Sequence, residues 1–201
     1  MERACPMKKR LDYDVIIDLI KPNSRVLDLG CGDGELLALL KDKKDCHGTG
    51  IEIDEKAIYE CMDKEVTVLQ GDIDSSLQDY SDKRFDYVIL NESVQQILNP
   101  ETVIMESLRV GKRVIVGIPN FCHTSSRIQV ALFGKVPITK WLPYKWYNTP
   151  NLRFLSLNDF RQFCQDKGIM IEKERFLRTT GEISFWPNLL AHHGVFLLKK
   201  E

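Results

Sequence analysis

Residues 25–34 of the chain read Arg-Val-Leu-Asp-Leu-Gly-Cys-Gly-Asp-Gly. The run opens as a short apolar strand and continues into a loop with glycine at positions 30, 32 and 34, after which a helical stretch begins at Glu35. Glycines placed after a strand let a ligand approach the backbone and leave free amides at the start of the next helix. The pattern therefore predicts a ligand site at the carboxyl end of this strand.

Two acidic residues in the same run, Asp28 and Asp33, indicate the charge of the ligand. A loop that holds a pyrophosphate is expected to avoid carboxylates, whereas a ligand with an amine and a sulfonium is attracted to them. The spacing is also GxGxG and not the GxGxxG of the dinucleotide fingerprint. We predict S-adenosylmethionine (SAM) or its demethylated product S-adenosylhomocysteine (SAH), with a dinucleotide as the weaker alternative.

Predicted strands and helices alternate along the chain, which indicates an α/β fold. We expect a doubly wound, Rossmann-like sheet of about seven strands, with a long link between the last two, which form an antiparallel pair. The strands are predicted at residues 25–29, 47–53, 66–70, 85–90, 114–118, 169–177 and 195–199.

Capping residues mark the predicted helices. Asp54, Asn99 (before Pro100) and Ser156 (with Asp159) are expected to cap the helices that follow them, and Gly134 and Gly168 to end two helices. The helices are predicted at residues 11–19, 35–43, 55–63, from 100 onward, 124–133 and 157–167.

Polar or small residues follow four successive strands, and the carboxyl ends of parallel strands meet at one edge of a sheet. Each has an ordinary explanation alone, as a tight turn, a solvated strand end or a helix-capping acid, but together they predict a SAM site. Glu52 lies 22 residues after Gly30 and is suited to accept from the ribose hydroxyls. The predicted cofactor-binding residues are Asp28, Gly30, Cys31, Gly32, Glu52, Ile53, Asp72, Ile73 and Asn91.

Each part of the cofactor is expected to lie at the end of a particular strand. Asp72 is placed to accept from the adenine amino group while Ile73 packs on the base, and Asn91 lies beside the methionine end. We expect Cys31 to occupy the loop because its side chain is small, and not because of a reactive thiol.

Size and composition indicate one soluble domain over residues 1–201. A net charge of −1 gives no reason to expect nucleic acid or an anionic membrane as partner. Six cysteines are scattered without a CxxC pair, so no metal site is expected. With neither a secretory leader nor a long apolar run, we expect a cytoplasmic protein with reduced thiols.

An aromatic and proline-rich insertion is expected at about residues 136–151, where three prolines and four large aromatic residues occur without a regular period. The segment suits contact with a partner, a lid over a substrate, or core packing. The aromatic residues are Trp141, Tyr144, Trp146 and Tyr147.

Several stretches resemble known families. Residues 25–34, 50–54, 70–74 and 85–90 resemble class I SAM-dependent methyltransferases in general. Residues 118–123, 136–140 and 142–151 more narrowly resemble the MetW family of methionine biosynthesis, and this likeness spans about residues 10–198. The resemblance implies a methyltransferase-like fold and a homoserine O-acyltransferase as partner, which the protein supports in an accessory or regulatory role. It implies no particular methyl acceptor.

Catalytic signatures are few. Asn91-Glu92-Ser93-Val94 follows the fourth strand in place of an Asn-Pro-Pro-Tyr motif. His123, just past the fifth strand, is the candidate base, with a hydrogen-bonded helix start as its alternative. His192 and His193 are expected to be partly exposed and not to bind metal. An accessory protein of methionine synthesis is thus favoured, with a small-molecule SAM-dependent methyltransferase as the alternative.

Overall fold

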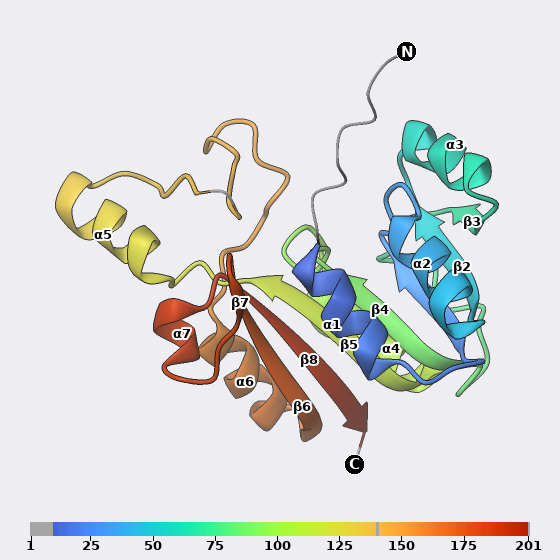
Figure 1. Ribbon diagram of the computed structural model, residues 1–201. Helices are drawn as coiled ribbons and strands as arrows, with labels where there is room; N and C mark the ends of the chain where they lie inside the picture. The colour runs from blue at the N-terminus through green and yellow to red at the C-terminus, as the bar shows by residue number, and fades with distance from the viewer. Residues whose placement is uncertain (1–9, 140, 201) are drawn as a thin grey trace.

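The computed structural model describes residues 10–139 and 141–200, which form one mixed eight-stranded sheet flanked by helices (Figure 1). The order of the strands is β3-β2-β1-β4-β5-β8-β6-β7. The strands are β1 (Arg25–Leu29), β2 (His47–Glu52), β3 (Thr67–Gln70), β4 (Phe85–Asn91), β5 (Gly111–Pro119), β6 (Ile169–Arg178), β7 (Gly181–Glu182) and β8 (His193–Lys200). The helices are α1 (Leu11–Leu19), α2 (Glu35–Lys44), α3 (Glu55–Asp63), α4 (Pro100–Val110), α5 (Thr124–Phe133), α6 (Leu157–Asp166) and α7 (Pro187–Leu190).

The sheet is doubly wound. β1 to β5 pair in parallel, and the direction in which strands are added reverses between β1 and β4. β8 runs antiparallel to both β5 and β6. The predicted fold class and the antiparallel final pair are confirmed. The additional strand is β7, a two-residue strand in the long link, which pairs with the end of β6.

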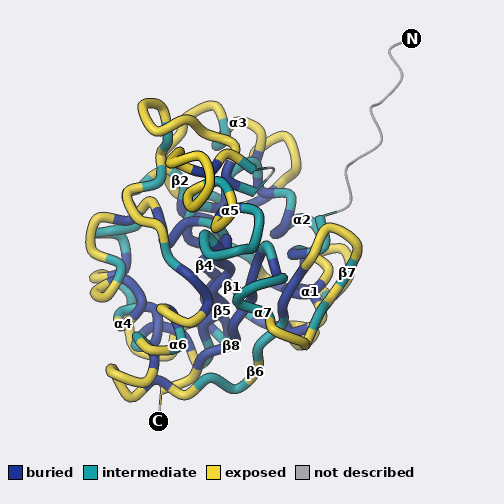
Figure 2. The backbone as a smooth tube through the Cα atoms, turned by 90° about the vertical axis from the view of Figure 1, so that its left-hand side faces the viewer, coloured by how far each residue is buried: buried dark blue, intermediate teal, exposed yellow. Residues whose placement is uncertain are grey.

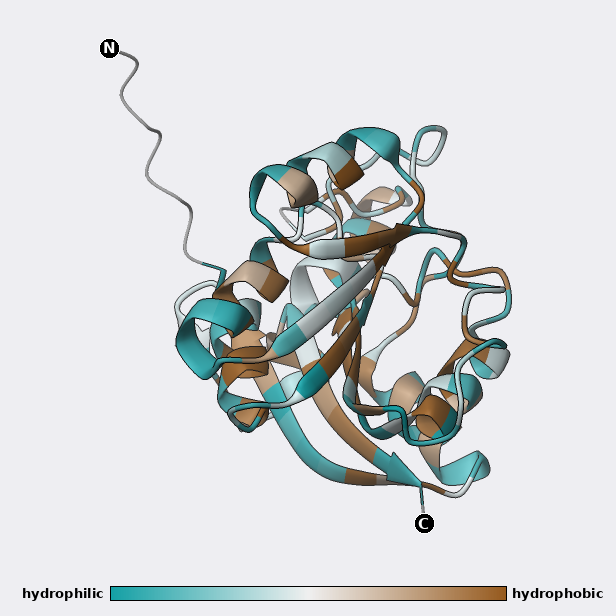
Figure 3. Ribbon diagram, turned by 90° about the vertical axis from the view of Figure 1, so that its right-hand side faces the viewer, coloured by the Kyte–Doolittle hydropathy of each residue, from teal (hydrophilic) through white to brown (hydrophobic). Residues whose placement is uncertain are grey.

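Each face of the sheet carries its own hydrophobic layer. The alternation along β1 shows why: Leu27 and Leu29 pack with residues of α4 and α6, whereas Val26 packs with residues of α1 and α2 on the opposite face. The central strands β1, β4, β5 and β8 are buried along most of their length (Figure 2). The helices carry both hydrophobic and hydrophilic residues (Figure 3). Asp28, one residue after Leu27, therefore faces the α1–α2 layer.

Two of the three predicted N-caps are confirmed. Asp54 Oδ1 accepts from the amides of Lys56 and Ala57, and Ser156 forms a reciprocal capping box with Asp159. The prediction for Asn99 is wrong, since its side chain makes no capping hydrogen bond with α4.

The backbone amides just before α4 donate to Asp74. Its carboxylate, from the loop after β3, accepts from the backbone N–H groups of Leu98 and Asn99 at 3.0 and 2.8 Å. A carboxylate 25 residues away in sequence thus fixes the start of this helix, which a local capping pattern cannot reveal.

α5 and the segment after it stand apart from the sheet (Figure 1). Of the residues of α5, only Ser126 is buried. Among the described residues between α5 and α6 there is no helix or strand. The predicted insertion over residues 136–151 falls within this irregular segment.

The caps supply a test of the fold. We predict that Asp54→Ala lowers the free energy of unfolding by about 1 kcal/mol, the usual cost of losing an N-cap. Asn99→Ala is the matched control and should change it by less than half as much, because the Asn99 side chain caps nothing. Urea denaturation of both variants measures the difference, and equal losses would contradict the assignment.

Candidate functional site

A cavity of about 440 Å³ opens where β1, β2, β3 and β4 end. Its walls come from the loops after these four strands, at the point where the order of strand addition reverses, which is where open α/β sheets bind ligands. The lining residues are Gly30, Glu52, Ile53, Gly71, Asp72, Ile73, Asp74, Asn91, Glu92, Ser93, Gln96, Ile97 and Leu98.

The glycine loop forms one wall of the cavity through its backbone. Gly30, Gly32 and Gly34 have φ of 78°, 55° and 73°, in the left-handed region that other residues adopt at a cost. A Cβ atom on Gly30 would lie 3.2 Å from Cδ1 of Ile73. Glycine at this position therefore keeps the floor of the cavity open.

Cys31 belongs to the loop but does not line the cavity. Its sulfur lies 3.9 Å from that of Cys61, and a Cβ atom on Gly50 would overlap it. Burial raises the pKa of the Cys31 thiol, so the sulfur is neutral and packs as a small hydrophobic group.

Glu52 is fixed at the end of β2 by backbone donors. One carboxylate oxygen accepts from the amide of Gly32 at 2.8 Å, and the other accepts from Ile53 and Asp54 at 2.8 and 3.0 Å. The carboxylate thus bridges the glycine loop and the β2–α3 turn, with its charge at the rim of the cavity.

Exposed hydrophobic side chains form the far end of the cavity. Ile53 is 66% exposed and Leu98 62% exposed, and both line the cavity together with Ile73, which packs against Gly30. Asp72 accepts from the amide of Asp74 and lies on the same wall. Such a wall, with one acidic group beside apolar side chains, fits a flat heteroaromatic ring with an amino group.

Asp28 lies behind the glycine loop and not in the wall of the cavity. It is 3% exposed, on the face of β1 that meets α1 and α2. Burial, with the nearby charge of Glu52, raises the pKa of Asp28 to about 7. The carboxyl group is therefore close to its protonation midpoint at neutral pH.

The end of β4 forms the other end of the cavity and brings α1 to the site. The Asn91 amide donates to the carboxylate of Asp12 at 2.9 Å. Arg10 donates to both oxygens of Asp12 and to Glu92 at 3.3 Å. Asp12 is 1% exposed; burial works to raise its pKa, but the hydrogen bonds from Arg10 outweigh this and the pKa lies below its usual range.

Sequence reasoning missed part of this site. Arg10 and Asp12 were given no role in the site, and no local pattern connects Asp12 to Asn91, 79 residues further along the chain. Glu92 was noted but not assigned. Its φ of 58°, a strained conformation that is concentrated at functional sites, is visible only in the structure. Asp74 and residues 96–98 were also missed, because they follow the strand ends by several residues.

The histidines differ from expectation in part. His123 caps α5, accepting from the amide of Ser125 at 3.0 Å, and is not among the residues that line the cavity. The expectation that His193 is partly exposed is wrong: its side chain is 0% exposed, because β8 begins at His193 and pairs it with Pro119. The ring of His192 stacks on that of His123, with centroids 3.9 Å apart.

The aromatic residues of the insertion divide into two groups. Trp141 is half-buried, with its ring centroid 5.7 Å from that of His193. Tyr144, Trp146 and Tyr147 are exposed, Trp146 by 74%. Core packing thus does not account for these three side chains.

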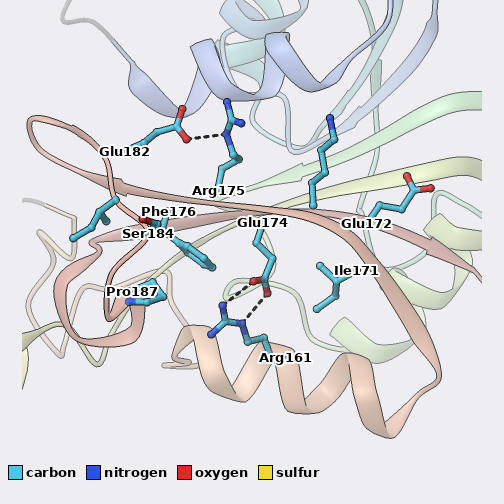
Figure 4. Close-up of a pocket in the computed structure, with 11 residues that line it drawn as sticks. Arg161, Ile171, Glu172, Glu174, Arg175, Phe176, Glu182, Ser184 and Pro187 are labelled. Carbon is cyan, nitrogen blue, oxygen red and sulfur yellow. Dashed lines mark hydrogen bonds and ion pairs between the residues drawn. The ribbon is translucent and has the colours of Figure 1, made fainter.

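A second cavity, of about 820 Å³, lies between β6, β7 and the start of α6 and α7 (Figure 4). Four of its charged residues pair with one another, Arg161 with Glu174 and Arg175 with Glu182, each at 2.7 Å, and Glu172 pairs with Arg113 of β5 at 2.6 Å. Since these charges are already neutralised and the glycine loop is at the other end of the sheet, we do not assign the ligand site to this groove.

Two general features of the described residues bear on the site. No helix in residues 10–139 and 141–200 is long and apolar enough to cross a membrane. Within the same ranges, no group of three or more His, Cys, Asp or Glu side chains is arranged to hold a metal ion.

The strand order and the cavity beside the glycine loop define a class I SAM-dependent methyltransferase fold. A crystal structure from Thermotoga maritima, described as a SAM-dependent methyltransferase and possible histamine N-methyltransferase, superposes with a TM-score of 0.69 at 19% identity, covering 95% of this chain and 88% of that one. A SAM-dependent methyltransferase from Archaeoglobus fulgidus gives 0.69 at 20% identity, covering 94% and 91%.

Residues 10–198 match the model of the family described as methionine biosynthesis protein MetW, and the chain belongs to this family. A curated relative, the bifunctional methionine biosynthesis protein MetXA/MetW of Rhodopirellula baltica, is 32% identical over 175 residues, which are 83% of this chain. The match spans 28% of that longer protein.

The raised pKa of Asp28 leads to a prediction about stability. Because the pKa in the folded protein, about 7, is above the ordinary 3.8, the folded state binds the extra proton and stability falls as pH rises from about 4 to 7. Asp28→Asn should abolish this decline, because asparagine does not titrate. At pH 8 its free energy of unfolding should exceed that of the parent protein, by about 1.4 kcal/mol for each unit by which folding raises the pKa of Asp28.

Urea denaturation of the ligand-free protein between pH 4.5 and 8.5 measures this effect. The exposed Asp79→Asn is the matched control and should follow the parent curve. If the free energy of unfolding of Asp28→Asn depends on pH in the same way as that of the parent protein, the assigned pKa of Asp28 is incorrect.

Proposed function

We propose that the chain binds SAM in the cavity beside the glycine loop. The adenine would lie against Ile53 and Ile73 with its amino group near Asp72, the ribose hydroxyls would donate to Glu52, and the methionine end would reach Asn91. Bound SAM supplies a methyl group activated by its sulfonium. The observation that carries the proposal is the set of carboxylates around a cavity at the switch point of a methyltransferase fold.

Unpartnered polar atoms support the fit. The side-chain oxygens Oδ1 of Asn91 and Oγ of Ser93 are buried and have no hydrogen-bond partner among the described residues, although both residues line the cavity. Buried polar atoms without partners are uncommon in folded proteins. The amine and carboxylate of a methionine moiety would supply partners for them.

Glu52 provides the direct test of the SAM site. We predict that Glu52→Ala weakens SAM binding by roughly 1–3 kcal/mol, because it removes charge-assisted hydrogen bonds to the ribose. Glu60→Ala, an exposed change of the same kind on α3, is the control and should bind SAM as the parent does. Titration calorimetry measures both, and unchanged affinity in Glu52→Ala would show that the ribose lies elsewhere.

For the biological role, we propose that the protein acts with a homoserine O-acyltransferase as an accessory or regulatory partner. The curated relative is named as a bifunctional MetXA/MetW protein, so both parts belong to one polypeptide. Fusion of two proteins keeps them at a high effective concentration. SAM would then control acylation through its different affinity for two states of the complex.

We assign the contact with the acyltransferase to α5 and the insertion. Both segments carry many exposed apolar side chains, which mark interaction sites where they gather, and tryptophan and tyrosine dominate interface energetics. Trp146 and Tyr147 meet edge to face, and Tyr144, Trp146 and Phe154 share one small crevice. The surface comprises Ile128, Val130, Leu132, Phe133, Val136, Ile138, Tyr144, Trp146, Tyr147 and Phe154.

Mixing experiments test this role. We predict that the purified chain forms a complex with a homoserine O-acyltransferase and changes the rate of homoserine acylation. Trp146→Ala should weaken the complex by about 2 kcal/mol or more, as expected of an interface hot spot, without changing SAM affinity. Phe185→Ala, an exposed aromatic residue outside this surface, is the control.

Gel filtration and an acylation assay, each with and without SAM, supply the readouts. The absence of both a complex and a rate effect would refute the accessory role. Equal binding by the parent and Trp146→Ala would place the interface elsewhere.

A second candidate function is methyl transfer to a small molecule, since the methionine end of the cavity continues into a polar cluster. Incubating the protein with labelled SAM and a metabolite extract distinguishes the two functions. A methylated product would favour the enzyme.

A further inference from the structure

Beyond the end of the cofactor cavity lies a partly buried polar cluster formed by Arg10, Asp12, Glu92, Trp141 and His193, of which Asp12 and His193 are fully buried. It joins four parts of the chain: the start of α1, the end of β4, the insertion and the start of β8. Asn91 and Glu92 belong to the cavity wall, whereas Trp141 and His193 do not. The cluster therefore begins where the proposed SAM site ends.

His193 is the unusual member of the cluster. Its side chain is 0% exposed, and neither ring nitrogen has a hydrogen-bond partner among the described residues. Its Nε2 atom lies 3.9 Å from a carboxylate oxygen of Glu92, so the ring is directed toward that group. Burial lowers the pKa of His193 to about 4, and the ring is a neutral donor and acceptor at pH 7.

Trp141 presents a second unpartnered group. Its indole Nε1 is buried and has no hydrogen-bond partner in the described part of the chain, and its ring packs beside that of His193. Leaving such buried groups without hydrogen-bond partners is destabilising. Two adjacent side chains with unused donors and acceptors point to a ligand that is polar and not apolar.

Charge decides the class of ligand. The buried carboxylate of Asp12 is satisfied by both donors of Arg10 and by Asn91. Glu92 receives only the 3.3 Å contact from Arg10. Among the described residues, two carboxylates and one guanidinium leave one negative charge in the cluster, while His193 adds none.

The backbone at Glu92 adopts an unfavourable conformation that a hydrogen bond from its amide supports. Glu92 has φ of 58°, a left-handed conformation that costs a non-glycine residue free energy and is concentrated at functional sites. Its amide donates to the carbonyl of Gly117 at 2.9 Å. A Cβ atom on Gly117 would overlap Asn91 and lie 3.1 Å from Cε1 of His193, so this glycine lets both side chains approach.

We propose that this cluster is a second ligand site, which binds a small molecule carrying a protonated amine next to the methionine end of the SAM site. The ammonium group donates to the carboxylate of Glu92 and to the acceptor nitrogen of His193. Trp141 donates from its indole to a polar atom of the ligand and closes the site from the insertion. Entry requires that Trp141 moves, because it now covers His193.

Three four-carbon probes test the charge preference: n-butylamine, n-butanol and n-butyrate. We expect n-butylamine to bind the full chain at least fivefold more tightly than the other two in ligand-observed NMR titrations, with or without saturating SAH. Glu92→Gln should reduce amine affinity at least fivefold. Glu60→Gln, exposed on α3, is the matched control and should leave it unchanged.

The indole N–H signals supply a readout that does not require a charge variant. The chain has three tryptophans, and Trp141→Phe identifies the signal of Trp141. The amine should shift that signal and leave those of the exposed Trp146 and Trp186 in place.

Equal binding of amine and butyrate, unaltered amine affinity in Glu92→Gln, no binding of any probe, or no shift at Trp141 would each overturn the proposal. The SAH titration is separate, so a failed SAM site and a failed amine site give different results.

Discussion

The carboxylate of Glu52 connects the second strand to the glycine loop, and the cavity depends on this connection. Strand pairing places the ends of β1 and β2 side by side, but it does not fix the loop that follows β1. By accepting from the amide of Gly32 and from two amides of its own turn, Glu52 holds two loops in one arrangement. The same group places negative charge at the rim, so one side chain both holds the two loops in place and supplies charge to the cavity.

The sequence was most informative where structure is local or periodic. Alternation of apolar residues, glycines after strands and caps such as Asp54 depend on neighbours within a few positions, and these predictions of strands and fold class were confirmed. The prediction for Asn99 failed because its side chain makes no hydrogen bond with α4. The amides of Leu98 and Asn99, just before the helix, are bound by the distant carboxylate of Asp74. The sequence also located the four strand ends that surround the cavity, because parallel strands bring their ends to one edge.

The cluster around Asp12 could not be predicted, for a related physical reason. The salt bridge between Arg10 and Asp12 is typical of a helix start, but here the Asp12 carboxylate is also buried and accepts from Asn91 at the end of β4. His193 was expected near the surface because two neighbouring histidines are polar, yet two additional residues of β8 place it inside the sheet. Burial of polar groups arises from packing across 80 to 180 residues of sequence, and no local pattern encodes it.

The insertion shows how one segment can serve an interior site and an exterior surface. Trp141 turns inward beside His192 and His193, while Trp146 and Tyr147 remain in solvent only a few residues later. His123, which caps α5, stacks on His192, so aromatic contacts run from α5 through the start of β8 to Trp141. A ligand that displaces Trp141 would change this stack and, with it, the position of the segment that carries the exposed residues. Two sites that bias one such element are coupled by necessity, since each binding free energy then depends on the occupancy of the other.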